Sequence, residues 1–239
     1  YIPGTSTEWS NTAQGDTGEM IEEGLRIGAA IAQMDERIGS PMALPPGNPP
    51  VKPGMQGDMS KPHTIVVDQS GERYMRESCS YMAIARAMRE RDRLSPAVPS
   101  WMVLDSQYMG TYMLAGTMPG AKKPKPWFEE QFLRRGDTLD ELATACSMDP
   151  AKLRNSVERF NRFVRKGWDE DFHRGEHAYD QWLGDSLHQP SPTLGSIEKA
   201  PFFALPVYPG DVSTFGGLVT DVHARVLREI IRPTVDGMA

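Results

Sequence analysis

Residues 208–221 read Tyr-Pro-Gly-Asp-Val-Ser-Thr-Phe-Gly-Gly-Leu-Val-Thr-Asp, and the rest of the chain can be interpreted outward from them. An apolar run precedes this stretch at 202–207, and the short segment Ala-Arg-Val-Leu-Arg follows at 224–228. Apolar runs separated by segments rich in Gly and Pro predict strand, tight turn, strand, turn and strand. The adjacent Gly216 and Gly217 carry no Cβ, so a flat or bulky ligand could approach the backbone there. A hairpin bulge without any ligand would need the same two glycines.

The residues around this glycine pair resemble the family of FAD-dependent 3-ketosteroid Δ1-dehydrogenases, within the wider fumarate reductase flavoprotein group. In that group a Thr-x-Gly-Gly element passes close to the isoalloxazine ring, and Thr214, Phe215, Gly216 and Gly217 match it. The resemblance therefore implies FAD as cofactor, with these four residues at its ring end. Fumarate reductases carry a His before the Thr, which helps to bind a dicarboxylate. This chain has Ser213 there, and the preceding Tyr-Pro-Gly-Asp run favours the steroid branch.

Length and composition indicate a globular protein. The chain has 239 residues, 39% of them hydrophobic, which allows one large domain or two small ones. Its net charge of −6 argues against a general nucleic-acid binder. Cys79 and Cys146 are the two cysteines and have no metal-site or disulfide spacing, so a reduced, cytoplasmic setting is expected. No apolar run is long enough to span a bilayer, and no signal peptide is visible.

A second motif lies in residues 64–93. Thr64–Asp68 predicts a strand, 69–72 a turn, 73–75 the returning strand of a hairpin, and the residues from about 81 to 93 a helix. The family carries a Gly-x-Arg-Phe-x-Asn-Glu-Ser-x-x-Tyr pattern here. The chain keeps five of its residues and changes three, with Tyr for Phe, Arg for Asn and Ser for a common Pro. The five retained are Gly71, Arg73, Glu77, Ser78 and Tyr81, and the three changed are Tyr74, Arg76 and Ser80.

The resemblance gives Tyr81 a chemical role. Desaturating a 3-ketosteroid beside its carbonyl requires a base for the α proton, a donor for the enolate oxygen and a flavin that accepts the hydride. In the family a Tyr of the cap domain is a proposed catalytic residue, and Tyr81 matches it. The implied activity is FAD-dependent 1,2-desaturation of a steroid, with Tyr81 as the base. The alternative for Tyr81 is a half-buried aromatic that only begins a helix.

The remaining cap residues predict helices and a possible pocket. Trp101–Asp105 predicts a buried strand, and residues 107–115 an apolar helix whose Tyr112 and Leu114 could line the steroid site. A Met- and Tyr-rich stripe of this kind is more often core than pocket. Thr138 and Asp149-Pro150 predict the starts of two further helices, at 139–146 and 150–166.

The stretch from Asp169 to Gly175 resembles one in the family. It contains His173 among acidic residues, but its spacing fits no standard metal site, so we expect a surface turn and no metal.

The overall prediction is an α+β protein. It comprises a cap with a small sheet and several helices, plus incomplete pieces of an α/β FAD-binding domain. Residues 1–38 and 201–239 are assigned to the FAD-binding pieces, 39–63 to a Pro-rich interdomain loop and 64–200 to the cap. In the first piece Asp16 or Thr17 should cap a helix that continues toward Ala32, with Gly24 and Gly28 in a small-residue stripe.

One part of the flavin site is missing from the sequence. No Gly-x-Gly-x-x-Gly follows a strand, so the dinucleotide fingerprint is absent. Residues 230–239 also depart from the family pattern. The chain therefore resembles the truncated middle of an enzyme, with two alternatives left open. It could be a catalytically inactive fragment, or part of another flavin oxidoreductase of the fumarate reductase group.

Overall fold

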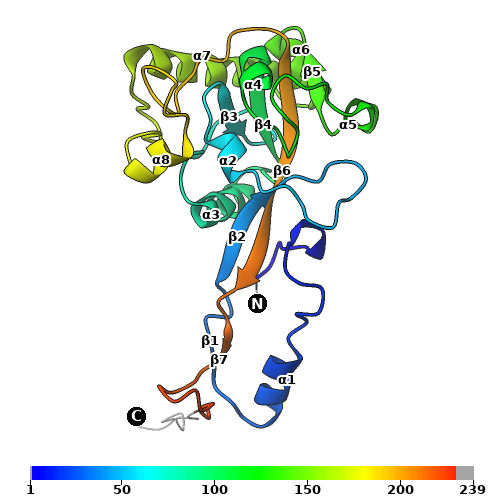
Figure 1. Cartoon of the computed structure of the whole chain (residues 1–239), viewed down its shortest axis with the longest axis vertical. Helices are drawn as coiled ribbons and strands as arrows, with labels where there is room; N and C mark the ends of the chain where they lie inside the picture. Colours follow the sequence, from blue (N-terminus) through cyan, green and yellow to red (C-terminus); the bar gives the residue numbers. More distant parts are fainter. Residues whose placement is uncertain (1, 230–239) are drawn as a thin grey trace, which may run out of the picture. The chain divides into compact units, whose positions relative to one another are not determined.

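The computed structural model describes residues 2–229, which divide into two compact units (Figure 1). The small unit comprises residues 2–3, 12–38 and 213–229 of the described chain, and the large unit comprises 4–11 and 39–212. Helices and antiparallel strands are mixed along the chain, which confirms the predicted α+β class. The segment at 39–63 and the strand residues at 202–212 belong to the large unit. Residues 230–239 lie outside the described residues.

The large unit contains an antiparallel sheet with strand order β2-β6-β4-β3, and β5 also pairs with β6. The register places Thr64 opposite Leu104, Ser100 opposite Val207, and Arg134 opposite Ala204. The strands are β2 (Arg37–Met42), β3 (Thr64–Val67), β4 (Ser100–Asp105), β5 (Arg134–Gly136) and β6 (Phe202–Thr214).

Two predictions about Pro-containing segments are wrong. A tight turn was expected after the apolar run at 202–207, but the chain continues there as the unbroken strand β6. Within it, Gly210 allows a close approach, since a Cβ there would lie 2.1 Å from the Trp9 carbonyl oxygen. The region expected to be a loop contains β2 and the short helix α2 (Gln56–Met59). Strand β2 stands at the end of the sheet order, where Pro41, which lacks an N–H, is tolerated.

Most of the remaining helices follow their local sequence signals. Thr138 accepts a hydrogen bond from the Glu141 backbone N–H, and Asp149 accepts one from that of Ala151, as their helix-capping patterns predicted. The predicted helix from 81 to 93 is also confirmed. These elements are η1 (Thr7–Trp9), α3 (Tyr81–Asp92), α4 (Ser106–Thr111), α5 (Lys125–Glu129), α6 (Leu139–Ala145), α7 (Pro150–Lys166) and α8 (Ala178–Leu183).

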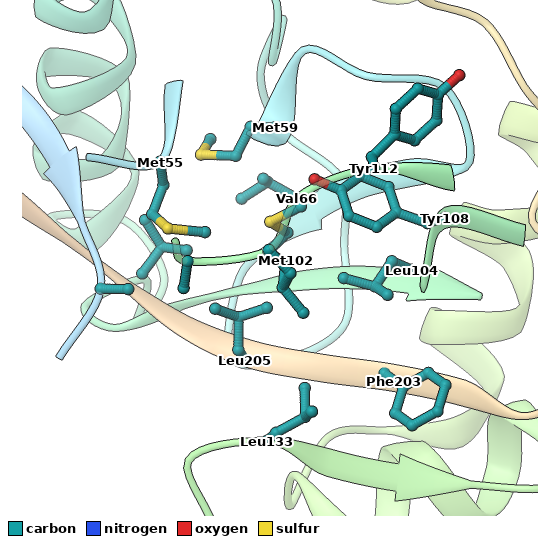
Figure 2. Close-up of a cluster of buried hydrophobic side chains, with 14 of the residues drawn as sticks. Met55, Met59, Val66, Met102, Leu104, Tyr108, Tyr112, Leu133, Phe203 and Leu205 are labelled. Atoms are coloured by element: carbon teal, nitrogen blue, oxygen red, sulfur yellow. The ribbon is translucent and has the colours of Figure 1, made fainter. Parts of the chain in front are cut away.

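Both faces of the sheet are buried, each against its own hydrophobic cluster. Successive strand residues alternate between the two clusters, so Val66 belongs to one while Ile65 and Val67 belong to the other. The first cluster contains methionines and two tyrosines beside the sheet (Figure 2). The second includes residues of α6 and α7, among them Leu142, Leu153 and Phe160. Strands buried on both faces explain the near-continuous apolar runs in their sequence.

The small unit is built from α1 (Glu19–Arg26) and the antiparallel pair β1 (Ile31–Ala32) and β7 (Gly217–Leu218). The predicted N-cap at Asp16 or Thr17 is wrong, because Gly18 occupies that position with φ +87° and gives no side-chain cap. The helix also ends before Gly28, whose φ of +80° turns the chain toward β1. Close packing at Gly24 is confirmed, since a Cβ there would lie 2.4 Å from a Leu218 methyl. Across residues 2–229, no helix is long and apolar enough to cross a membrane.

Candidate functional site

Tyr81 is the first residue of α3. Ser80 stands where the family commonly has Pro, and it caps the helix because its hydroxyl accepts a hydrogen bond from the Ala83 backbone N–H at 3.3 Å. The Tyr81 residue is 36% exposed, and its hydroxyl has no hydrogen-bond partner within the described chain. A phenol in this setting can meet a ligand without first breaking an internal hydrogen bond.

The segment leading into Tyr81, residues 76–80, is tied to two other helices. The Gln56 side-chain amide on α2 donates to the Cys79 carbonyl at 3.1 Å and to the Tyr179 hydroxyl on α8 at 3.0 Å. Arg76, which replaces the family Asn, lies 3.7 Å from the buried carboxylate of Asp180, also on α8. These contacts hold the entry to α3 against α2 and α8.

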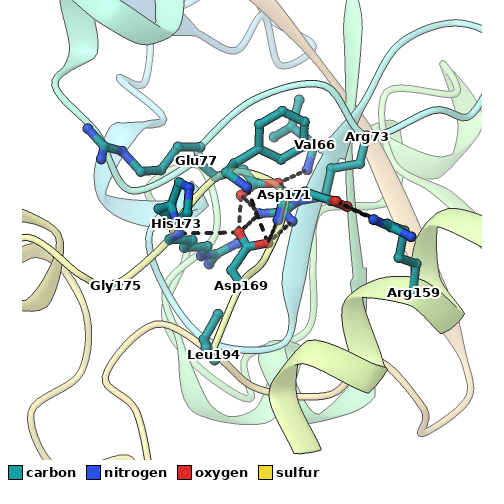
Figure 3. A network of polar contacts seen from close by, with 12 residues as sticks. Val66, Arg73, Glu77, Arg159, Asp169, Asp171, His173, Gly175 and Leu194 are labelled. Carbon is teal, nitrogen blue, oxygen red and sulfur yellow. Dashed lines mark hydrogen bonds and ion pairs between the residues drawn. The ribbon is translucent and has the colours of Figure 1, made fainter. Parts of the chain in front are cut away.

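Glu77 anchors the same segment in the protein interior (Figure 3). Its carboxylate accepts a hydrogen bond from the Val66 backbone N–H at 3.1 Å and two from the Arg73 guanidinium, each at 2.8 Å. Arg174 adds a further hydrogen bond at 3.1 Å, and the Arg174 and Glu77 side chains are fully buried. The predicted return strand at 73–75 is wrong, since only an isolated bridge pairs Arg73 with Val67 and the true partner of β3 is β4.

Asp169 completes this buried charge network, which we define as Arg73, Glu77, Asp169 and Arg174. Its carboxylate accepts two hydrogen bonds from Arg73, at 2.9 and 2.7 Å, and one from the Arg174 backbone N–H at 3.2 Å. The Arg174 guanidinium also donates to three backbone carbonyls, those of Met59, Lys61 and Thr64.

The predicted surface turn at 169–175 is therefore wrong for its two charged ends, because Asp169 is 0% and Arg174 1% exposed. His173, between them, has an exposed side chain beside Glu176. No group of three or more possible metal ligands occurs within the described chain.

The two carboxylates of the network are held in their charged forms. Burial opposes ionisation of Glu77, but the charges of Arg73 and Arg174 outweigh it and lower the pKa of Glu77. Burial likewise opposes ionisation of Asp169, while hydrogen bonds and charge from Arg73 lower its pKa. Two cations thus balance two anions in the interior, an arrangement that fixes geometry when every partner is present.

The two predicted substrate-lining residues lie in the hydrophobic interior. Helix α4 ends at Thr111, so the helix predicted over 107–115 is wrong beyond that residue. Leu114 is 0% and Tyr112 8% exposed, and the Tyr112 hydroxyl donates to an Asp185 carboxylate oxygen at 2.9 Å. Burial, reinforced by Asp185, raises the pKa of Tyr112. Both residues share their cluster with Cys79, two positions before Tyr81. Their contact with a substrate stays a prediction.

The predicted flavin-contacting residues lie in the small unit, whereas Tyr81 lies in the large unit. A Cβ on Gly216 would lie 2.8 Å from the Met34 Cα, so the packing of residues 33–34 already requires this glycine. Around Gly217, by contrast, no atom beyond its two chain neighbours lies within 4 Å of where a Cβ would be. Phe215 is 48% exposed, and Thr214 is also exposed. A Cβ at Gly217 would thus be unobstructed, and contact of Thr214, Phe215 and Gly217 with a flavin stays a prediction.

Sequence reasoning missed Gln56, Asp169 and Arg174 as partners of the Tyr81 segment. The family motif contained Arg73 and Glu77, but their partners lie about a hundred positions away, and Asp169 pairs with Arg73 across a separation of 96. The signal available in the sequence was the Arg–Glu pair within one motif. Such a pair, when buried, requires further compensating groups elsewhere in the chain.

Comparison with known proteins agrees with these features. The family model for an FAD binding domain matches residues 1–237. The 3-oxosteroid 1-dehydrogenase of Mycolicibacterium smegmatis is 37% identical over 229 residues, covering 94% of this chain and 40% of the relative. The 4-oxocyclohexanecarboxylate 2-dehydrogenase of Sinomonas cyclohexanicum is 35% identical over 88% of this chain and 37% of its own length.

Among solved structures, the 3-ketosteroid delta1-dehydrogenase of Sterolibacterium denitrificans, in complex with 1,4-androstadiene-3,17-dione, matches with a TM-score of 0.91 and 35% identity. The match covers 96% of this chain and 42% of that one. The chain thus spans about 40% of the length of the curated relatives it matches.

Proposed function

The chain belongs to the FAD binding domain family, and on this premise we propose that it supplies the catalytic part of a flavoenzyme that desaturates 3-ketosteroids between C1 and C2. The observation that carries the proposal is the position of Tyr81. Tyr81 is 36% exposed and begins α3, and the preceding segment is anchored by a buried charge network. Similarity to 3-oxosteroid 1-dehydrogenases over 94% of the chain supports the same reaction.

In the proposed reaction, the C1–H and C2–H bonds of the steroid A ring break and a C1=C2 double bond forms. The Tyr81 oxygen removes the C2 proton, which is acidified by the neighbouring C3 carbonyl. FAD, when bound, supplies the acceptor for the hydride that leaves C1. The chain's own contribution is to hold the Tyr81 oxygen at a fixed position relative to C2, because proton transfer requires hydrogen-bond reach.

The small unit would hold the ring end of FAD. Thr214, Phe215 and Gly217 are the candidate contacts, since they are exposed or border open space. Gly216 was predicted to belong with them, and its packing against residues 33–34 gives it a structural role as well. In this proposal the large unit is the cap, and Tyr112 and Leu114 support the steroid site from within the hydrophobic cluster that also contains Cys79.

Three alternatives make different demands on the chain. Reduction of a dicarboxylate in the fumarate reductase manner is disfavoured, because Ser213 replaces the expected His. The Sinomonas relative, by its name, oxidises a cyclic ketone that carries a carboxylate, so a smaller ring ketone is a second candidate substrate. An inactive fragment would bind neither steroid nor flavin productively.

The test grafts this chain in place of the matching segment of the Mycolicibacterium smegmatis relative. We expect the graft to retain FAD and to convert androst-4-ene-3,17-dione to its Δ1 product faster than it reduces fumarate or desaturates 4-oxocyclohexanecarboxylate. Tyr81→Phe should lower turnover by roughly 100-fold or more with KM within about twofold, since general acid–base catalysis contributes about 10²–10⁴. Tyr208→Phe, a matched change on β6, should leave turnover unaltered.

Two results would contradict the proposal. One is a graft that holds FAD at full occupancy yet forms no Δ1 product. The other is a Tyr81→Phe graft whose turnover stays within about threefold of the parent graft, equivalent to about 0.6 kcal/mol of transition-state stabilisation.

A further inference from the structure

We infer that Gln56 is a positioning residue for Tyr81, acting through the backbone of Cys79. Nothing in the family motif at 71–81 indicates this residue, which lies on a different element, α2. The inference rests on the proposed function, because positioning Tyr81 matters to catalysis only if Tyr81 takes the proton. The contact that carries it is the hydrogen bond from the Gln56 side chain to the Cys79 carbonyl.

The Cys79 carbonyl needs a hydrogen-bond donor from outside α3, because it lies just before the start of that helix. The first hydrogen bond of α3 is accepted by the Ser80 carbonyl, from the Ile84 backbone N–H at 3.0 Å. Cys79 precedes that cap, so its carbonyl cannot be paired within the helix. Gln56 supplies the missing donor at 3.1 Å, in a part-buried position. Removing that donor would leave a backbone acceptor unpaired two residues before Tyr81.

The Gln56 amide is itself held in place from the other side. Its nitrogen also donates to the Tyr179 hydroxyl at 3.0 Å, so both N–H groups are used. Gln56, Cys79 and Tyr179 lie on α2, on the segment before α3 and on α8, respectively. One side chain thus connects three elements at the point where the chain turns into α3. A side chain with one donor could make only one of these contacts.

The stretch between the other two anchors would otherwise be weakly tied. Glu77 fixes the chain four residues before Tyr81, and Ser80 fixes it one residue before. Between them, the Ser78 hydroxyl is buried and has no hydrogen-bond partner in the described chain. The Cys79 thiol lies against the hydrophobic cluster and makes two polar contacts, a weak one with the Ser80 carbonyl at 3.8 Å and one with the Arg76 side chain. The Cys79 backbone N–H donates to the Arg76 carbonyl at 3.3 Å, within the same segment. Those contacts lie within residues 76–80, whereas Gln56 ties the Cys79 carbonyl to a separate element, α2.

The experiment has one readout on the chain alone. 3-Fluorotyrosine is placed at position 81, and its ¹⁹F resonance is followed in the parent, in Gln56→Met and in Tyr179→Phe. Gln56→Met removes both donors with little change in shape, and it should shift or broaden the resonance. Tyr179→Phe keeps the contact to Cys79, so its effect should be in the same direction and smaller. Gln69→Met is the matched control, because the Gln69 amide also donates to a backbone carbonyl, that of Val98 at 2.9 Å.

The second readout is kinetic and uses the graft described above. Gln56→Met should lower kcat about tenfold with KM within about twofold, whereas Gln69→Met should leave both unchanged. A role confined to stability would lower the melting temperature of both Gln variants without moving the fluorine resonance or kcat. The inference is overturned if the resonance of a folded Gln56→Met chain coincides with that of the parent, or if Gln69→Met gives an equal effect.

The two proposals fail in different ways. If Gln56→Met moves the resonance but Tyr81→Phe leaves turnover unchanged, Gln56 positions Tyr81 and the proposed function is wrong. If Tyr81→Phe abolishes turnover while Gln56→Met alters neither readout, the proposed function stands and the role of Gln56 is wrong.

Discussion

Asp169→Asn should destabilise the large unit far more than its place in a short connecting turn would indicate. The substitution keeps the shape of the side chain but removes one of two negative charges in the buried charge network. Arg73 and Arg174 would then share Glu77 as their single buried anion within the network. Asp169 also accepts hydrogen bonds from the backbone N–H groups of Asp171 and Arg174, each at 3.2 Å, which an amide oxygen can only partly retain.

The expected size follows from burial. The Asp169 side chain is 0% exposed, and that of Arg73 5%. Removing one partner of such a pair leaves an uncompensated buried charge, which costs about 3–5 kcal/mol. For a domain of this size, each 1 kcal/mol lowers the melting temperature by roughly 2–4 °C, so a decrease of about 6–20 °C is expected.

The assay is urea and thermal unfolding, followed by circular dichroism, with Asp171→Asn as the matched control. Asp171 lies two residues away and pairs with Arg159, but these side chains are 25% and 52% exposed. An exposed pair contributes about 0–1 kcal/mol, so the control should be nearly as stable as the parent. Equal losses in the two variants, or an Asp169→Asn loss below about 1 kcal/mol, would refute the assignment of a buried network.

Asp169→Asn should also change how the stability of the chain depends on pH. The pKa of Asp169 is lower in the folded chain than the unfolded value of about 3.9, so the unfolded state binds the proton first. The stability that this carboxylate provides is therefore complete above about pH 4 and is lost as the pH falls through the folded pKa. Asp169→Asn should show a smaller loss of stability than the parent on acidification below pH 4.

Three further predictions concern other sites. Gly217→Val should leave the chain folded, because no atom lies within 4 Å of the new Cβ, but should reduce the flavin content of the graft; normal flavin content would exclude Gly217 as a contact. Burial raises the pKa of Asp58 to about 6, so between about pH 4 and pH 6 the folded state keeps a proton that the unfolded state has lost. The free energy of unfolding should therefore fall as the pH rises through this range, and Asp58→Asn should abolish this fall in urea melts. The isolated chain should bind FAD with a Kd above about 1 μM by calorimetry, and a tighter Kd would refute this prediction. The chain lacks a Gly-rich turn for the FAD phosphates, and the acidic Glu19 and Glu22 in the first turn of α1 would repel them.

Local signals in the sequence predicted several elements well. Thr138 and Asp149-Pro150 begin their helices as expected, because a cap is decided by residues within one turn of it. The strand at 101–105 was also correct, since its apolar run is bounded by polar residues. Tyr81 begins a helix, although whether it is catalytic stays a prediction.

The failures arise where distant contacts override local preferences. A turn was predicted after the apolar run at 202–207, yet Pro209 and Gly210 continue β6, because the missing Cβ of Gly210 admits the Trp9 carbonyl from a segment two hundred positions away. Asp169 and Arg174 look like surface residues until Arg73 and Glu77 are brought beside them. Gln56 carries no motif at all, and only the folded chain places its amide beside Cys79.

The long sequence separation within the buried charge network also has a consequence for folding kinetics. Joining Arg73 to Asp169 closes a loop of 96 positions, and joining Thr64 to Arg174 spans 110. Contacts of such separation carry a large closure entropy, so we expect them to form after the rate-limiting step of folding. Asp169→Asn should then accelerate unfolding while leaving the refolding rate nearly unchanged, a partition that the two arms of a chevron plot would measure directly. On this reasoning the network acts mainly as a barrier to unfolding, and it sets how long the native state persists once formed.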